Sequence, residues 1–333
     1  MRPLLLALSL LLTAPALVGA TEVSVHMAGE GKDDLQPVLD LVAGAKSRLW
    51  VLAYTLSDKD LLEVLAKKAN TPGFDLRVQI DSKQHLKSKA KLAVLGDAVT
   101  PIEVAEGGRM HIKLLLIDEE TVVAGSKNWS NLGSLSKWND LVVVKDPKLA
   151  GHVAQHFGRL GGFKAARNRP WRTKDVRLSF NEPGKPGART REELLRLLKS
   201  AKKRILVGMF VLNDPELAKL IWQQHEAKRV EVKVVLDGVQ FANLKRRKDR
   251  SAKTLLGHLE GLGSSLKLCR AKQLHHKFAL IDDVVITGSA NWTKAAWQKN
   301  HEAVLILRGK PATDFVEPYL KRHAALWETS APH

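Results

Sequence analysis

Two stretches of the chain carry the same order of apolar and polar positions. Residues 47–58 read SRLWVLAYTLSD and residues 203–214 read KRILVGMFVLND, and the same offset pairs the apolar run 76–81 with the run 232–237. Similarity that keeps one offset across several expected elements is the mark of an internal repeat. The pattern therefore predicts a tandem duplication, with two halves that share one fold.

Each half is predicted to alternate helices with strands. Amphipathic spacing predicts helices over 34–45 and 191–201, and apolar runs predict strands over 49–55 and 205–212. Another helix and a second strand follow in each half. The strand runs lack two-fold polar alternation, which is typical of strands covered by helices on both faces. The fold class is therefore α/β.

A segment rich in Pro, Gly and Arg separates the two halves. We place a first domain at 21–165, a linker with the start of the second half at 166–190, and a second domain at 191–333. The offset between the repeats grows beyond residue 240, so we expect an insertion in the second half within the basic segment 245–253.

The first twenty residues have the pattern of a secretory signal peptide. Arg2 precedes an apolar run at 4–12, and small residues at 18–20 form a cleavage site. An uncleaved membrane anchor is the alternative, although Thr13 and Pro15 interrupt a run that is already short for a span. We expect cleavage before Thr21 and export to the periplasm or the medium. Cys269 is the single cysteine, so no intrachain disulfide forms, and we expect it to be a small buried apolar residue.

Charge adds a class of partner. The chain has 53 Lys and Arg against 35 Asp and Glu, a net charge of +18, within 333 residues that are 44% hydrophobic. That apolar content suffices for two cores and argues against intrinsic disorder. A field of this sign attracts nucleic acid or anionic membrane, and a merely well-solvated surface is the alternative.

Each half ends in the same polar residues in the same order. A histidine and a lysine two positions apart open an apolar strand, and a Gly-Ser-x-Asn run ends the strand that returns. The residues are His111, Lys113, Ser126 and Asn128, and then His275, Lys277, Ser289 and Asn291. Alternate strand residues share a face, so each histidine lies beside its lysine and His276 faces the other side. Recurrence in both halves favours catalysis over histidines that merely fill a core.

A phosphodiesterase needs such a set: a nucleophile, a proton donor for the leaving oxygen, and groups that hold the phosphoryl oxygens. One imidazole is predicted to attack phosphorus while the other protonates the leaving alkoxide. The lysines and asparagines would clamp the oxygens. We expect no cofactor and no metal, because an ammonium group beside each histidine disfavours a cation there.

Four carboxylates accompany the motifs. Asp118 and Asp282 fall at hairpin turns, with strand parity opposite to the histidines, and are predicted to be turn and scaffold residues. Asp140 in KWND and Glu302 in KNHE take matching places in the two halves and are predicted to hold an imidazole in its working tautomer. The first half has one more residue between Asn128 and its carboxylate than the second half has at the corresponding place.

The doubled pattern H-x-K-x4-D followed by G-S-x-N resembles the phospholipase D superfamily, and the match covers the chain from residue 21 onward. The resemblance implies a tandem duplication of a phospholipase D-type α/β domain, each with a mixed sheet flanked by helices, around a pseudo-twofold interface. It implies one site at that interface and a covalent phosphohistidine intermediate. In the family the first-half histidine is usually the nucleophile, which would make His111 the attacking group and His275 the general acid.

The substrate stays open at this point, because the motif recognises a phosphodiester and not what is esterified to it. A phospholipid head-group hydrolase suits an exported protein, with peripheral contact to an anionic membrane and no obligate protein partner. A nuclease suits the charge, the basic segment 245–250 and the run GSANWTKAA, which is similar to small bacterial endonucleases of the superfamily. A phosphatidyl transferase of the cardiolipin synthase kind and an inactive polyanion-binding protein are further alternatives.

Overall fold

The computed structural model describes residues 21–29, 36–105, 107–130, 137–162, 169–184, 188–309 and 315–333. The predicted signal peptide, residues 1–20, lies outside these ranges, as does part of the predicted linker. Within the described ranges, every helix is too short or too polar to span a membrane.

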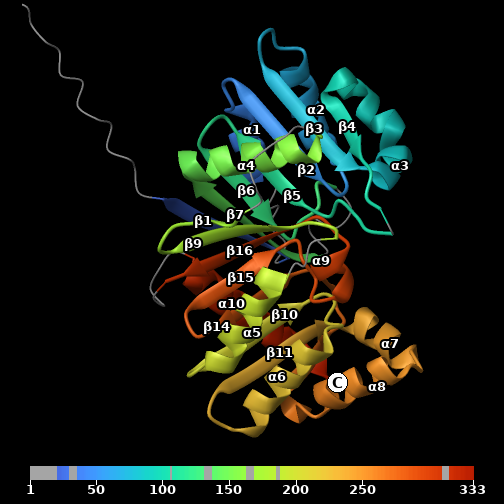
Figure 1. The fold of residues 1–333 in the computed structure, drawn as a ribbon, viewed down its shortest axis with the longest axis vertical. Coiled ribbons are helices and arrows are strands. Elements are labelled where there is room, and N and C mark those ends of the chain that lie inside the picture. Colours follow the sequence, from blue (N-terminus) through green and yellow to red (C-terminus); the bar gives the residue numbers. More distant parts are fainter. Residues whose placement is uncertain are drawn as a thin grey trace, which may run out of the picture.

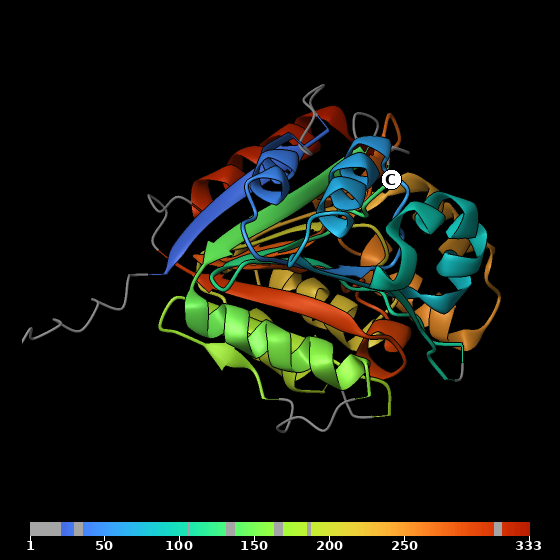
Figure 2. The same ribbon diagram turned by 90° about the horizontal axis from the view of Figure 1, so that it is seen from above.

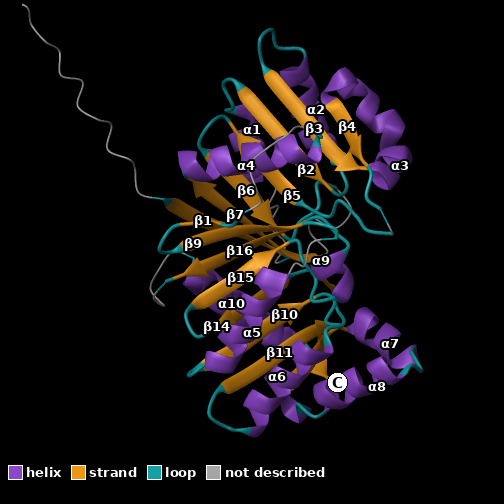
Figure 3. Ribbon diagram, in the orientation of Figure 1, coloured by secondary structure: helices purple, strands orange, loops and turns teal. Residues whose placement is uncertain are grey.

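The two halves contain equivalent mixed sheets (Figures 1 and 3). In each, three neighbouring strands run parallel and the remaining strands of the shared pattern pair antiparallel. The first sheet has the order β1 (Glu22–Ala28), β7 (Lys137–Lys145), β6 (Thr121–Gly125), β5 (Lys113–Ile117), β2 (Arg48–Ala53), β3 (Asp75–Asp81), β4 (Val99–Ile102). The second has the order β8 (Trp171–Arg172), β9 (Val176–Asn181), β16 (Glu302–Arg308), β15 (Val284–Gly288), β14 (Lys277–Ile281), β10 (Arg204–Met209), β11 (Glu231–Asp237), β12 (Leu266–Cys269), β17 (Ala331–Pro332). The predicted duplication of a mixed-sheet α/β domain is confirmed.

Helices flank both sheets. The first half has α1 (Gln36–Ala43), α2 (Lys59–Ala69), α3 (Ser82–Leu92), the 3-10 helix η1 (Ala93–Ala98) and α4 (Pro147–Leu160). The second has α5 (Ala188–Ser200), α6 (Pro215–Glu226), α7 (Gly238–Arg246), α8 (Arg250–Glu260), the 3-10 helix η2 (Gly263–Ser265), α9 (Lys294–Gln298) and α10 (Val316–Thr329). The helices and strands predicted from periodicity are present, with ends shifted by a few residues. The longer connection from β11 to β12, which holds α7 and α8, contains the expected insertion.

The inner faces of the two sheets share one hydrophobic core. Leu114 and Val142 of the first sheet belong to the same buried cluster as Phe278 and Leu305 of the second. Apolar residues of α4 and α10 join this cluster, and Figure 2 shows these two helices on opposite sides of the paired sheets. Separate cores lie between each sheet and its outer helices. Cys269 is buried and carries a free thiol, as expected.

Reciprocal backbone bonds join the halves. The short strand β13 (Gln273–Leu274) pairs in parallel with β7, and Met110 forms the equivalent bridge with His301. The amide of His275 donates to the carbonyl of Trp138 at 3.0 Å, and the amide of His111 donates to that of His301 at 2.9 Å. The backbone amide of each motif histidine is therefore hydrogen-bonded to the backbone of the opposite half. The two hydrogen bonds are equivalent under the pseudo-twofold symmetry.

Candidate active site

A duplicated aspartate positions the segment that precedes each histidine. Its Oδ1 caps a helix by accepting an amide of the first turn, while its Oδ2 accepts the amide of the residue just before the histidine. In the first half Asp81 binds Gln84 and Met110 at 3.2 and 3.0 Å, and in the second Asp237 binds Gln240 and Leu274 at 3.0 and 3.1 Å. Each aspartate thus links the first turn of α3 or α7 by hydrogen bonds to the residue that precedes a motif histidine.

His111 is paired with a carboxylate of the other half. Its Nδ1 lies 2.9 Å from Oε2 and 3.1 Å from Oε1 of Glu302, and both side chains are buried. Glu302 also accepts from the Oγ of Ser289 and, at 2.8 Å, from Nδ2 of Asn300. An ionised carboxylate only accepts hydrogen bonds, so Nδ1 carries the proton and Nε2 has a free lone pair. Burial lowers the pKa of His111 to about 4, which leaves the imidazole neutral near pH 7.

His275 is paired with a neutral amide instead. Its Nδ1 lies 2.9 Å from Oδ1 of Asn139, again a residue of the opposite half. Burial, followed by the positive charges of Lys277 and Lys113, holds the pKa of His275 well below its usual range, and His111 contributes in the same direction. The structure therefore brings both motif histidines and both motif lysines into one site between the halves.

The lysines lie beneath the histidines. The Nζ of Lys113 donates to the carbonyl oxygen of His111 and that of Lys277 to the carbonyl oxygen of His275, each at 2.5 Å. Burial lowers the pKa of Lys113 to about 7 and that of Lys277 well below its ordinary value. An anionic phosphoryl group placed between them favours the charged ammonium forms.

The motif asparagines offer open acceptors, and aromatic rings line the site. Oδ1 of Asn128 and Oδ1 of Asn291 are both buried without a hydrogen-bond partner among the described residues. Tyr54 lies edge-on to His111 with ring centroids 4.9 Å apart, and Phe210 takes the equivalent place against His275 at 5.0 Å. Apolar walls of this kind strengthen the electrostatic interactions inside the site.

The structure corrects the predicted pairing of Asp140 with Glu302. The strand register instead makes Asn139 the counterpart of Glu302 and Ala303 the counterpart of Asp140. The supporting pairs are Gly125 with Leu141 and Gly288 with Val304 in the ladders, and the amides of Ser126 and Ser289 with the carbonyls of Asp140 and Ala303. A shift of one residue turns a strand side chain to the opposite face, so Asp140 points away from His275.

Asp140 instead organises a buried network beneath the second motif. Its Oδ1 accepts from Nδ1 of His276 at 3.1 Å and from Oγ of Ser126 at 2.5 Å, and its Oδ2 accepts from Oη of Tyr319 at 2.5 Å and from Oγ1 of Thr287. Burial raises the pKa of Asp140, but hydrogen bonds and the charge of His276 outweigh it and hold that pKa well below its usual range. The corresponding places beneath the first motif are apolar. Ile112 and Ala124 of the first half correspond to His276 and Thr287, and Ala303 of the second half corresponds to Asp140.

The two halves of the chain each match one known protein family. A family model described as "Cardiolipin synthase, PLD-like domain" matches residues 38–160 and, separately, residues 194–327. The two matches together cover more than half of the chain, and each contains most strands of one sheet. The chain belongs to the phospholipase D superfamily. The predicted family membership is confirmed, and this phospholipase D-like protein carries two copies of the family domain in one chain.

Curated relatives match part of the phospholipase D-like chain. Mitochondrial cardiolipin hydrolase of Mus musculus is 33% identical over 147 residues, which are 42% of this chain and 58% of the relative. Phospholipase D of Rickettsia bellii is 25% identical over 128 residues, 36% of this chain and 60% of the relative. The chain therefore spans less than two thirds of the length of these relatives.

A solved structure confirms the fold over nearly the whole chain. The crystal structure of phosphatidylserine synthase from Haemophilus influenzae superposes with a TM-score of 0.67, covering 93% of this chain and 87% of that one. The sequence identity is 14%, so the likeness is one of fold.

The motif aspartates of this phospholipase D-like protein lie away from the histidines. Asp118 and Asp282 occupy hairpin turns with φ of 52°, and their carboxylates accept backbone amides of residues 46–48 and 202–204. Burial raises the pKa of Asp118, but these backbone hydrogen bonds outweigh it and lower the pKa below its usual value. Both aspartates thus fasten the hairpin to the start of the neighbouring strand.

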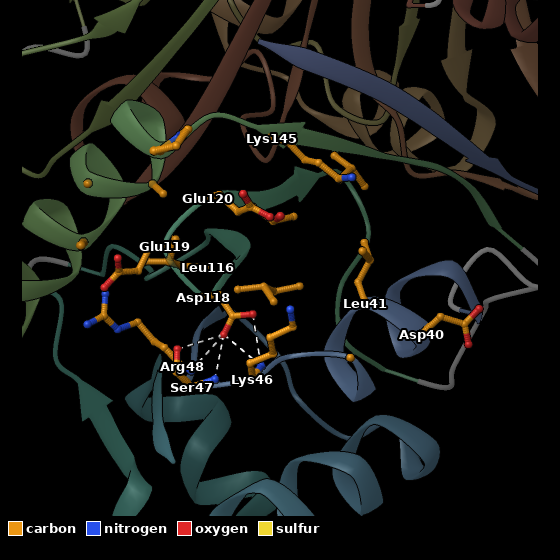
Figure 4. A pocket seen from close by; sticks show the side chains of 18 of the residues that line it. Asp40, Leu41, Lys46, Ser47, Arg48, Leu116, Asp118, Glu119, Glu120 and Lys145 are labelled. Atoms are coloured by element: carbon orange, nitrogen blue, oxygen red, sulfur yellow. Dashed lines mark hydrogen bonds between the residues drawn. The ribbon is translucent and has the colours of Figure 1, made fainter. Parts of the chain in front are cut away.

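A cavity at the Asp118 turn is distinct from the site. It has a volume of about 1200 Å³ and is lined by residues of α1, β1, α4 and the turn itself (Figure 4). His111 lies at the opposite end of β5, so this cavity does not hold the candidate chemistry. Among the described residues, no group of three or more His, Cys, Asp or Glu is arranged to hold a metal ion.

Sequence reasoning missed Asn139, Tyr54 and Phe210. A signal for Asn139 was present, because the spacing from Asn128 to Asn139 equals that from Asn291 to Glu302. The aromatic residues occupy one position of the repeat, residues 54 and 210, which could have marked them as a pair.

Proposed function

We propose that this protein is an exported phosphodiesterase that cleaves its substrate through a covalent phosphohistidine on His111. One observation carries the proposal: the two histidines, each held by the opposite half, have different partners, a carboxylate for His111 and an amide for His275. This difference supports different roles for the two histidines of otherwise equivalent motifs.

In the first step, Nε2 of His111 attacks phosphorus, and the bond from phosphorus to the leaving oxygen breaks. The bound anionic diester raises the pKa of His275 above its value in the free protein, so Nε2 is protonated and gives its proton to the departing alkoxide. In the second step a water attacks phosphorus while His275 accepts its proton, and the bond from phosphorus to nitrogen breaks. His111 is then neutral again, His275 is protonated again, and the products are an alcohol and a phosphomonoester.

The unequal partners support this assignment. A phosphorylated imidazole that retains its Nδ1 proton is cationic, and the carboxylate of Glu302 stabilises that charge as it develops. A carboxylate on the general acid would hold its proton too tightly. The amide of Asn139 orients His275 without this effect, so its imidazolium remains a good proton donor. Lys113 and Lys277 would balance the charge of the phosphoryl oxygens.

A phospholipid is the substrate that the relatives favour. Two of the similar proteins are named cardiolipin hydrolase and phospholipase D, and one similar fold is a phosphatidylserine synthase. We therefore propose a phospholipid head-group phosphodiester, with hydrolysis as the reaction and transfer to an alcohol as a side reaction. The net charge of +18 supports nucleic acid as the second candidate.

A substrate panel in excess chelator tests the proposal. The panel contains a soluble bis-aryl phosphodiester, phosphatidylcholine, phosphatidylglycerol, cardiolipin, single-stranded and duplex DNA, and RNA. We expect turnover of the aryl ester and of phospholipid, loss of both in His111→Ala, and no loss in the control His225→Ala on α6. Faster turnover of nucleic acid than of lipid would favour the nuclease. Turnover of no substrate would favour a polyanion-binding protein, and loss of activity in chelator that one divalent ion restores would contradict the mechanism.

A further inference from the structure

All three large apolar side chains that are exposed in the described part of the chain lie on two equivalent segments. Leu86 on α3 is 72% exposed, Val94 on η1 is 56% exposed and Val239 at the start of α7 is 66% exposed. Both α3 and α7 directly follow the second parallel strand of their half. Single exposed apolar residues are ordinary, but the restriction of all three to the segments that follow these two strands indicates a binding partner.

The exposed residues form a stripe along α3 and η1. Apolar side chains recur at spacings of four, three and one, which places them on one face of a helix. The exposed members are Leu86, Ala90, Ala93 and Val94. This face points away from the core, because Leu92 and Leu95 supply the buried contacts.

Lysines border the stripe, and α3 has no acidic residue. The exposed lysines are Lys83, Lys87, Lys89 and Lys91. None of these four forms an ion pair with another described residue, whereas on α7 Lys245 is paired with Glu260 at 2.9 Å and the following Arg247 with Asp249 at 3.0 Å. Uncompensated positive charge therefore lies beside Leu86.

The same helices border the catalytic site. Nε2 of Gln84 on α3 donates to Oη of Tyr54 at 3.2 Å, and the ring of Tyr54 contacts His111. The aspartates Asp81 and Asp237 join the starts of α3 and α7 to the residues before the two histidines. Both helices lie on one side of the molecule in two perpendicular views (Figures 1 and 2).

We propose that α3, η1 and the start of α7 form a docking surface that seats the site on an anionic lipid bilayer. This inference rests on the proposed function and specifies how its substrate is presented, as phospholipid within a membrane. Aliphatic side chains gain by entering the acyl boundary while neighbouring lysines bind anionic head groups. Nucleic acid fits less well, since surfaces for single strands use aromatic rings for stacking and would leave Leu86 in water.

Vesicle sedimentation of the full chain tests the surface. Phosphatidylcholine vesicles are compared with vesicles that also contain phosphatidylglycerol. We expect Leu86→Ser/Val94→Ser to weaken partition onto the anionic vesicles about tenfold, and Lys87→Gln/Lys91→Gln to weaken it roughly fivefold per lysine at low salt. The matched control Lys148→Gln/Lys199→Gln, on α4 and α5, should bind as the unsubstituted chain does.

Soluble bis-aryl phosphodiester supplies the second measurement. Its turnover should be the same in all three variants, while hydrolysis of vesicle lipid falls in step with partition. Unchanged vesicle binding by Leu86→Ser/Val94→Ser would overturn the docking surface, as would equal loss on the soluble ester, or binding of duplex DNA in place of vesicles. A chain that sediments with anionic vesicles through Leu86 but hydrolyses no diester would support the surface and contradict the proposed function.

Discussion

His111 and Glu302 are 191 residues apart in the chain, yet Nδ1 of the histidine lies 2.9 Å from Oε2 of the carboxylate. The contact joins the two halves, so neither half alone contains both a motif histidine and its hydrogen-bond partner. Its pseudo-symmetric counterpart joins His275 to Asn139, which replaces the carboxylate by an amide. The two halves thus supply equivalent frameworks in which the two histidines have different partners, a carboxylate and an amide.

Leaving-group dependence should separate the two histidines. We expect His275→Ala to lose about 10²–10⁴-fold with an alkyl phosphodiester and far less with an aryl ester, whose phenolate leaves without a proton. His111→Ala should lose activity on both substrates, and a trapped phosphoenzyme should map to His111. A label on His275, or the opposite pattern of rescue, would exchange the two roles.

Exchanging the partners of the histidines tests their asymmetry. Glu302→Gln removes the charge that stabilises the phosphoimidazolium, and we expect phosphoenzyme formation to slow on the order of 100-fold. Asn139→Asp adds a carboxylate beside His275, raises its pKa, and should move the alkaline limb of the rate profile up by about one pH unit. Stopped-flow and pH-rate measurements report the two effects, and equal effects of both substitutions would mean that the pairs act only as structural supports.

Lys113 should give the enzyme a pH-dependent affinity for its substrate. Burial lowers its pKa to about 7, so in the free protein the ammonium loses its proton as the pH rises through neutrality. We therefore expect KM for an anionic diester to increase above about pH 7 with a smaller change in kcat. Lys113→Arg keeps its charge at higher pH and should flatten this rise. A KM independent of pH in the unsubstituted protein would count against a charge on Lys113 in binding.

Asp140 should stabilise the fold in a pH-dependent way. Its folded pKa lies below the ordinary value, so its contribution is complete above about pH 4 and is lost as the pH falls further, through the folded pKa. We expect Asp140→Asn to lower the free energy of unfolding by roughly 3 kcal/mol at neutral pH, measured by urea denaturation. The exposed control Asp249→Asn, which caps α8 through the amide of Ala252, should change little because asparagine is also a good cap. A difference from the unsubstituted protein that persists undiminished at acidic pH would exclude the charged network as its cause.

The sequence alone determined the duplication, the α/β class, the family and the two sets of histidine, lysine, serine and asparagine. These features depend on local spacing and on recurrence, both of which can be read along one chain. The assignment of Asp118 and Asp282 to hairpin turns followed from strand parity in the same way. The export signal and the domain boundaries remain predictions from composition.

Only the tertiary structure decided which residue serves which histidine. Asn139 and Asp140 are neighbours in sequence, but successive side chains of a strand point to opposite faces. The sequence comparison aligned Asp140 with Glu302, one residue away from the true counterpart Asn139, and therefore predicted the wrong partner for His275. The contacts of His111 and His275 cross between halves, and their register depends on how the two sheets pack. The spacing of residues within one half does not depend on that packing. The partners that distinguish the two histidines, Glu302 and Asn139, could therefore be identified only from the tertiary structure.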